Sequence, residues 1–211
     1  MIKRLAFVHP RVVTDRAASA PAQVRPVRAV SCIAVPELIA DQVHDGVAIE
    51  WFTDGDHLAR YARWLDAEDG APEGGAEVVV AEEHVLRGHE WLEARWAEGG
   101  VRLKHMAIAR RAEGLTPAQF SEVWQNRAGR VGSTPIPDIA KGCAYAQNHP
   151  VTRADGDWPY DAVNEVWFDD EDALRSRIAW MAEAVGAGGD DDFVGTSAFL
   201  AVREEVVIGG A

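Results

Sequence analysis

The chain has little lysine and no excess of positive charge. Its 211 residues include 21 Lys or Arg against 34 Asp or Glu, which gives a formal net charge of -13. A nucleic-acid-binding protein needs a basic stripe, and an anionic membrane surface repels an acidic protein. We therefore expect neither nucleic acid nor a membrane as a partner. The acidic balance favours a soluble protein, which we expect in the cytoplasm.

Cysteines and long apolar runs are also scarce. Cys32 and Cys143 are too few for a disulfide framework and form no Cys-x-x-Cys pair, so we expect reduced thiols. No apolar run approaches the roughly 18 residues of a membrane span, and Met1–Pro10 is too short and too polar for a signal peptide. The sequence has no phosphate-binding glycine motif and no Gly-x-Ser-x-Gly motif, so nucleotide binding and serine hydrolysis lack support.

The chain does contain an internal repeat. Glu50–Leu58 and Val166–Leu174 both place Trp-Phe, Asp and Leu at matching offsets, and a second tryptophan, Trp64 or Trp180, follows at the same distance. The strand-like segments around the two blocks occur in the same order; they are Ile2–His9, Arg28–Val35, Glu77–Leu86, Leu103–Ala109, Lys141–His149 and Ala198–Ile208. The repeat predicts two βαββαβ units, residues 1–98 and 101–211.

Helical signals lie between these strands. Thr116 followed by Gln119 predicts a capping box at the start of a helix. Residues 87–100, which join the two halves, have the pattern of a short amphipathic helix that ends at Gly99. Arg11–Pro26 contains two prolines and little apolar periodicity, so we expect a shortened helix or a loop there.

Both faces of the predicted third strands are apolar. In the second half, Val163 and Trp167 alternate with Val166 and Phe168. The helices of a split β-α-β unit cover one face of its sheet, so the other face needs a second sheet. We predict an α+β fold in which two tandem ferredoxin-like units with antiparallel sheets close into an α/β barrel. A pocket for a small, largely apolar molecule is expected between the facing sheets.

These segments resemble the EthD family of the dimeric α/β-barrel superfamily. The resembling parts are "EGLTPAQFSEVW", "YDAVNEVWFDDEDAL" and "DDFVGTSAFLAVREEVVI" in the second half and "HDGVAIEWFTDGDHL" and "VVVAEEHVLRG" in the first. The family usually builds its barrel by dimerisation, so a barrel within one chain and a homodimer both stay open. The resemblance implies a cofactor-free enzyme of the oxygenase, cyclase, isomerase or decarboxylase type. The alternative is a non-catalytic accessory protein that holds a small hydrophobic molecule for an oxygenase system.

One departure from the family pattern bears on mechanism. The first helix of the family usually carries Trp, three residues and then His, whereas Trp124 is followed by Ala128 at the histidine position. This difference favours the accessory-protein alternative.

We expect no cofactor, with haem as a weaker alternative. His44, His84 and His89 lack the spacing of metal ligands, so we expect no metal site.

The candidate catalytic residues lie on strands of the second half. Glu165 lies on the apolar face of its strand, where burial would raise its pKa and suit it to general acid–base catalysis. The resemblance also places a frequent family glutamate there. His149 and His105 are its candidate partners, because histidine exchanges protons near neutral pH. Candidate substrate-binding residues are Trp167, Trp51, Tyr145, Asn148, Trp124 and Arg127.

Each candidate also has a structural interpretation. Glu165 could form a structural ion pair, the histidines could be core or surface hydrogen-bonding groups, and Arg127 could lie on a solvated helix face. Asn164 is expected to be a satisfied core amide. Glu50 aligns with Val166 and not with Glu165, so we expect its side chain on the opposite face of the sheet.

Overall fold

The structure is a computed structural model that describes residues 1–67, 77–126, 135–153, 156–186 and 192–209. Its strands are β1 (Ile2–Phe7), β2 (Arg28–Ala34), β3 (Gly46–Phe52), β4 (Glu77–Arg87), β5 (Val101–Arg111), β6 (Ala144–Pro150), β7 (Ala162–Phe168) and β8 (Val194–Ile208). Its helices are α1 (Pro10–Ser19), α2 (Gly55–Ala67), α3 (His89–Glu98), α4 (Pro117–Asn126) and α5 (Glu171–Gly186), with a short 3-10 helix η1 (Asp138–Lys141).

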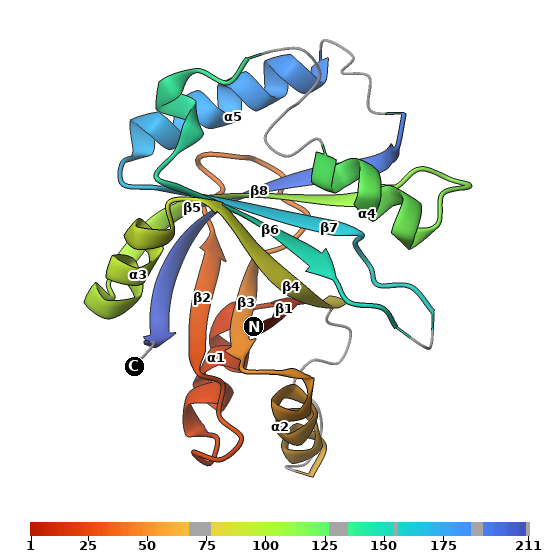
Figure 1. Cartoon of the computed structure of the whole chain (residues 1–211). Coiled ribbons are helices and arrows are strands. Elements are labelled where there is room, and N and C mark those ends of the chain that lie inside the picture. Colours follow the sequence, from red (N-terminus) through yellow and green to blue (C-terminus); the bar gives the residue numbers. More distant parts are fainter. Residues whose placement is uncertain (68–76, 127–134, 154–155, 187–191, 210–211) are drawn as a thin grey trace.

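The strands form one closed antiparallel barrel in the order β1-β3-β2-β8-β5-β7-β6-β4. Within each half the strand order is the same, β4-β1-β3-β2 and β8-β5-β7-β6, and the halves join where β2 pairs with β8 and β4 pairs with β6. The helices lie outside the barrel, with α1 and α2 beside the strands of the first half and α4 and α5 beside those of the second (Figure 1). The predicted α+β barrel is confirmed, and it closes within one chain.

Alternation along β7 separates the inside of the barrel from the helix side. Val163 and Trp167 belong to the largest buried cluster, whose members come from strands of both halves and from α3. Val166 and Phe168 belong to a different cluster that includes Leu174 of α5. Successive strand residues point to opposite faces of a sheet, so odd-numbered residues of β7 face inward and even-numbered residues face the helices.

Two of the predicted helix boundaries are confirmed. The backbone N–H of Gln119 donates to Thr116 Oγ1 at 3.3 Å, and the Thr116 N–H donates back to Gln119 Oε1 at 2.9 Å, which completes the capping box of α4. Helix α3 ends at Gly99, whose φ of 70° lies in the region that favours glycine. The connection between the halves is therefore the short helix that the sequence predicts.

Of the two alternatives for Arg11–Pro26, the structure has the short helix and not the loop. Helix α1 has ten residues and starts with Pro10, where a missing backbone N–H costs nothing. Val13 and Ala17 are buried at helical spacing, and the two prolines fall after the helix has ended. A narrow apolar stripe thus suffices here because tertiary packing on the sheet stabilises the helix.

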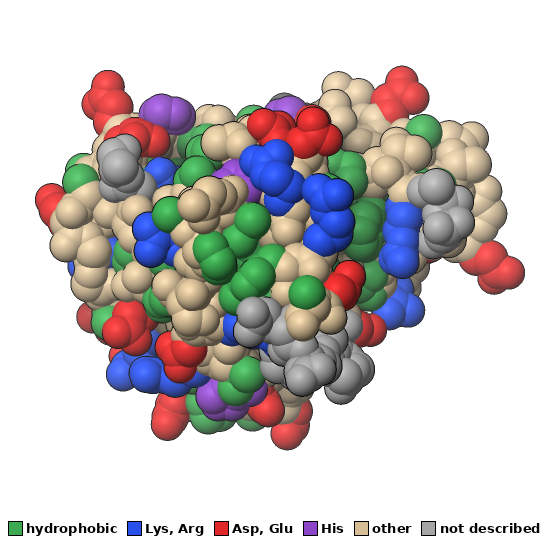
Figure 2. Space-filling view, turned by 90° about the horizontal axis from the view of Figure 1, so that it is seen from below, with side chains coloured by type: hydrophobic (Ala, Val, Ile, Leu, Met, Phe, Trp, Pro, Cys, Tyr) green, Lys and Arg blue, Asp and Glu red, His purple; other side chains and the backbone are tan. Residues whose placement is uncertain are grey.

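The surface carries charges of both signs. On the face shown in Figure 2, Lys and Arg side chains lie beside Asp and Glu side chains at several places around the rim. Among the described residues, no helix is both long enough and apolar enough to span a membrane.

Candidate functional site

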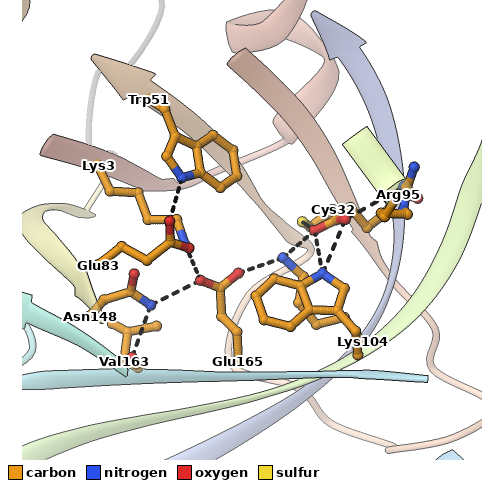
Figure 3. Close-up of polar contacts among 11 residues, drawn as sticks. Lys3, Cys32, Trp51, Glu83, Arg95, Lys104, Asn148, Val163 and Glu165 are labelled. Carbon is orange, nitrogen blue, oxygen red and sulfur yellow. Dashed lines mark hydrogen bonds and ion pairs between the residues drawn. The ribbon is translucent and has the colours of Figure 1, made fainter. Parts of the chain in front are cut away.

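The inside of the barrel holds an ion network centred on Glu165 (Figure 3). The Glu165 side chain is fully buried, and Lys104 Nζ lies 2.6 Å from its Oε2. The ammonium group of Lys3, also fully buried, binds Oε1. Asn148 Nδ2 donates to the same Oε1 at 2.9 Å. Both oxygens of this carboxylate are therefore occupied.

Around Glu165, each half contributes one lysine, one further glutamate and one tryptophan. They are Lys3, Glu83 and Trp51 from the first half and Lys104, Glu204 and Trp167 from the second. In both halves the lysine binds the glutamate, and the indole N–H donates to the same carboxylate, at 3.0 Å in the first half and 3.2 Å in the second. Arg95 of α3 lies 3.5 Å from Glu204 and adds a third cation.

The pKa of Glu165 differs in direction from the sequence-based expectation. Burial acts to raise this pKa, as predicted, but the ammonium groups of Lys104 and Lys3 outweigh burial and lower it to about 2. The sequence argument considered the apolar face alone and missed Lys104 on the neighbouring strand β5 and Lys3 on β1 in the other half of the barrel. At neutral pH Glu165 is an ionised member of a salt-bridge network, as in the structural interpretation.

The predicted grouping of Glu165 with His105 or His149 is not present. Glu165 points into the barrel, whereas His105 pairs across the sheet with Val166 and faces α5. His149 is half-buried, and its ring lies 4.6 Å from that of His84 on the outside of the barrel. Burial and the neighbouring His84 lower the pKa of His149. The sheet therefore separates the glutamate from both histidines.

The helix-covered face of the second half forms a second candidate site, which we call the outer-face site. Its floor consists of two cross-strand rows, Tyr145–Val166–His105–Ala201 and Gln147–Asn164–Ala107–Phe199. Trp124 of α4 packs over the next row, and Trp180 of α5 packs with Phe199. Arg177 of α5 is close enough to His105 for its charge to act on the imidazole.

Several buried polar atoms of the outer-face site have no hydrogen-bond partner in the described part of the chain. They are Asn164 Oδ1, Trp124 Nε1 and Arg177 Nε. Buried polar atoms in folded proteins are almost always hydrogen-bonded, so their grouping around one patch of sheet is unusual. Asn164 is consequently not the satisfied core amide that its sequence position suggests.

His105 is a further buried polar side chain of this site without a hydrogen-bond partner in the described part of the chain. It is 1% exposed, and its ring stacks on Phe199 with centroids 5.6 Å apart. No hydrogen bond of its ring nitrogens is found within the residues that the structure describes. Burial lowers the pKa of His105 to about 3, and the nearby charge of Arg177 acts in the same direction. At neutral pH the His105 side chain is therefore an uncharged imidazole, and neither ring nitrogen is hydrogen-bonded to a described residue.

The predicted substrate-binding residues divide between the two sites. Trp51, Trp167 and Asn148 lie in the barrel network, while Tyr145 and Trp124 belong to the outer-face site. Arg127 lies outside the described residues. Sequence reasoning did not single out Arg177, although this arginine lies three residues before Trp180 as Tyr61 lies before Trp64.

Among the comparisons with known proteins, solved structures give remote similarities. The chain matches no protein-family model and no curated protein. Among solved structures, it is similar to a "putative monooxygenase" from Lactobacillus acidophilus NCFM, with 10% sequence identity, coverage of 100% of this chain and 97% of that chain, and a TM-score of 0.41.

Proposed function

We propose that the protein binds a small, largely apolar molecule of the aromatic or polyketide-like class in the outer-face site and converts it without a cofactor. In this proposal the chain is a pair of tandem ferredoxin-like units of the EthD type, in line with the sequence resemblance. The observation that carries the proposal is His105, a buried, uncharged imidazole beside an aromatic ring, for which the described residues provide no hydrogen bond.

The outer-face site suits such a ligand better than the barrel interior. Inside the barrel, Glu165, Lys3 and Lys104 are fully buried and already pair with one another, so their charges are not free to bind a ligand. On the outer face, Asn164, Phe199 and Trp124 are each partly accessible between the helices. Flat aromatic walls bind apolar molecules, and a few unsatisfied polar atoms fix the orientation of a ligand.

The simplest chemistry in this site is proton transfer. A ring nitrogen of His105 accepts a proton from a carbon or hydroxyl group of the ligand, which leaves an enolate or phenolate, and the imidazolium returns the proton to the product. Isomerisation, cyclisation, decarboxylation and oxygenation can all proceed through such an anion. Glu165 has no proton-transfer role in this proposal, because lysines bind both of its oxygens.

Incubation of the full-length protein with naphthols and hydroxyanthraquinones, followed by mass spectrometry, tests the proposal. We expect binding and conversion, with His105→Phe retaining binding and losing turnover by about 100-fold or more. His89→Phe is the matched control, because this histidine is exposed at the start of α3, away from the outer-face site, and it should leave turnover unchanged. Failure of the wild-type protein to bind any compound would contradict the proposal.

A non-catalytic accessory role is the second candidate. The observation that favours it is Ala128, which stands where the resembling family has a histidine after Trp124. In that case the same compounds would bind saturably and be recovered unchanged. Recovery of a chemically altered ligand would exclude this role.

A further inference from the structure

The two halves of the barrel differ at one matched position on their helix-covered faces. Strand pairing joins Arg4 to Glu50 in the first half and His105 to Val166 in the second. These pairs are equivalent, because each is the next pair along the strands after a Lys–Trp pair of the barrel network. Those pairs are Lys3–Trp51 and Lys104–Trp167. A buried carboxylate in the first half thus corresponds to an apolar side chain in the second.

In the first half the carboxylate neutralises a buried cation. Glu50 is fully buried and lies 2.5 Å from Arg4 Nη1. Tyr61 of α2 donates its hydroxyl to the other oxygen of Glu50 at 2.7 Å. The strand glutamate thus binds both the strand arginine and the helix tyrosine.

In the second half an arginine stands in place of the helix tyrosine, and Val166 stands in place of the carboxylate. Arg177 occupies the helix position equivalent to Tyr61 and is 7% exposed. Its guanidinium lies 4.7 Å from the centroid of the Trp180 ring, but within the described residues it forms no ion pair and its Nε has no hydrogen-bond partner. The ionisable groups that act on it are Tyr145 and a second arginine, Arg87. A buried cation without a counter-charge is costly.

Arg87 places a second positive charge near the first. It is the last residue of β4, pairs across the strands with Tyr145 and is solvent-exposed. Its side chain donates to the backbone oxygen of Lys141 and forms no ion pair within the described part of the chain. Two arginines without a carboxylate between them form a site for an anion, since guanidinium groups bind carboxylates and other oxyanions well.

We propose that the ligand of the outer-face site is an aromatic molecule with an oxyanion group, a carboxylate or a phenolate, which binds to Arg177 and takes the place that Glu50 holds in the first half. This inference rests on the proposed function and narrows its substrate class. Phe199 and Trp180 offer flat surfaces for the ring system. Arg87 attracts the anion at the exposed edge of the site.

Anion binding would also change the chemistry of His105. The positive charge of Arg177 lowers the pKa of this imidazole in addition to burial. An oxyanion on Arg177 cancels that charge, so the pKa of His105 rises when the ligand binds. The histidine then becomes a stronger base only in the complex, which couples proton transfer to recognition of the anion.

Calorimetric titration with matched pairs of ligands tests the inference. The probes are benzoate with benzamide and 2-naphthoate with 2-naphthamide, which differ in charge and little in shape. We expect the wild-type protein to bind each carboxylate at least ~10-fold more tightly than its amide, because a buried charge-assisted hydrogen bond is worth about that factor. Arg177→Met should abolish the difference and Arg177→Lys should retain part of it. Arg175→Met, on the exposed side of the same helix, is the control.

A second variant supplies the missing carboxylate within the protein. Val166→Glu should pair with Arg177 and weaken carboxylate binding by at least ~10-fold more than it weakens amide binding. Equal binding of carboxylate and amide by the wild type and by Arg177→Met would overturn the anion inference while the apolar site stands. If no member of either pair binds the wild type, both the anion inference and the proposed function fail.

Discussion

Lys3 and Lys104 bind opposite oxygens of one carboxylate, that of Glu165. The two lysines come from the first strand of each half, and the glutamate comes from β7. One side chain therefore connects the two halves at the centre of the barrel. This connection has direct consequences for stability.

Glu165→Gln should destabilise the protein by about 3 kcal/mol, since removing one partner of a buried ion pair leaves uncompensated charge. Urea unfolding followed by tryptophan fluorescence measures the change. Glu171→Gln removes an exposed carboxylate that pairs with Arg175 and should cost less than about 0.5 kcal/mol. Similar unfolding free energies for the two variants would show that the network contributes nothing.

Acid should reduce stability in two pH ranges. His105 has a folded-state pKa of about 3 against an ordinary value of 6.5, so the unfolded chain takes up the proton first and stability falls as pH drops from 6.5 towards 3. Glu165 has a folded-state pKa of about 2 against 4.5, so its contribution is complete above 4.5 and is lost as pH falls to 2.

His105→Phe separates these two ranges. The variant should remove a slope on the order of 1.4 kcal/mol per pH unit between pH 6.5 and about 3, which stands alone above pH 4.5, and leave the slope below pH 3 unchanged. Urea unfolding at half-unit pH intervals provides the measurement. Parallel curves for wild type and variant above pH 4.5 would mean that His105 is protonated in the folded protein.

Gly142→Ala should lower the melting temperature by several degrees. Gly142 has a φ of 71°, and an added Cβ would lie 2.5 Å from the backbone oxygen of Trp167, so both strain and a clash oppose the substitution. A loss of about 2 kcal/mol corresponds to roughly 4–8 °C for a chain of this size. Gly55→Ala meets no atom within 4 Å and should change the melting temperature little. Equal shifts in the two variants would contradict this account.

The two thiols should differ in their rate of alkylation. Cys32 is fully buried beside Glu204, and burial raises its pKa to about 12. Cys143 is half-buried, and burial together with Asp169 raises its pKa to about 11. We expect iodoacetamide at pH 8 to label Cys143 slowly and Cys32 only when the protein unfolds. Peptide mass spectrometry over time gives both rates, and early labelling of Cys32 would contradict its position inside the barrel.

The barrel could be predicted from the sequence because its signals are local and repeated. The matching blocks around Trp51 and Trp167 define equivalent strands, and apolar side chains on both faces require a covered sheet. The capping box at Thr116 and the stop at Gly99 mark helix ends through backbone hydrogen bonding alone. Helix α1 was harder to predict from the sequence, because packing against the sheet, and not the composition of the helix itself, stabilises it.

The site was less predictable because its properties arise between strands that are distant in sequence. Alternation in β7 correctly places Glu165 on the inner face, but the effect of Lys3 depends on a contact across 162 residues. Arg177 carries no motif of its own. Its importance appears only when Val166 is compared with Glu50, which requires the register of both halves.

The ion network also bears on why the two halves share one polypeptide. Its cations are Lys3, Lys104 and Arg95, and its anions are Glu83, Glu165 and Glu204, so the charges cancel. Two copies of the second half alone would place two lysines among four carboxylates. Two copies of the first half would lack the central glutamate, since Ile49 stands at that position. Charge balance among these six groups thus depends on unlike halves, which a single chain provides and a symmetric homodimer of either half does not.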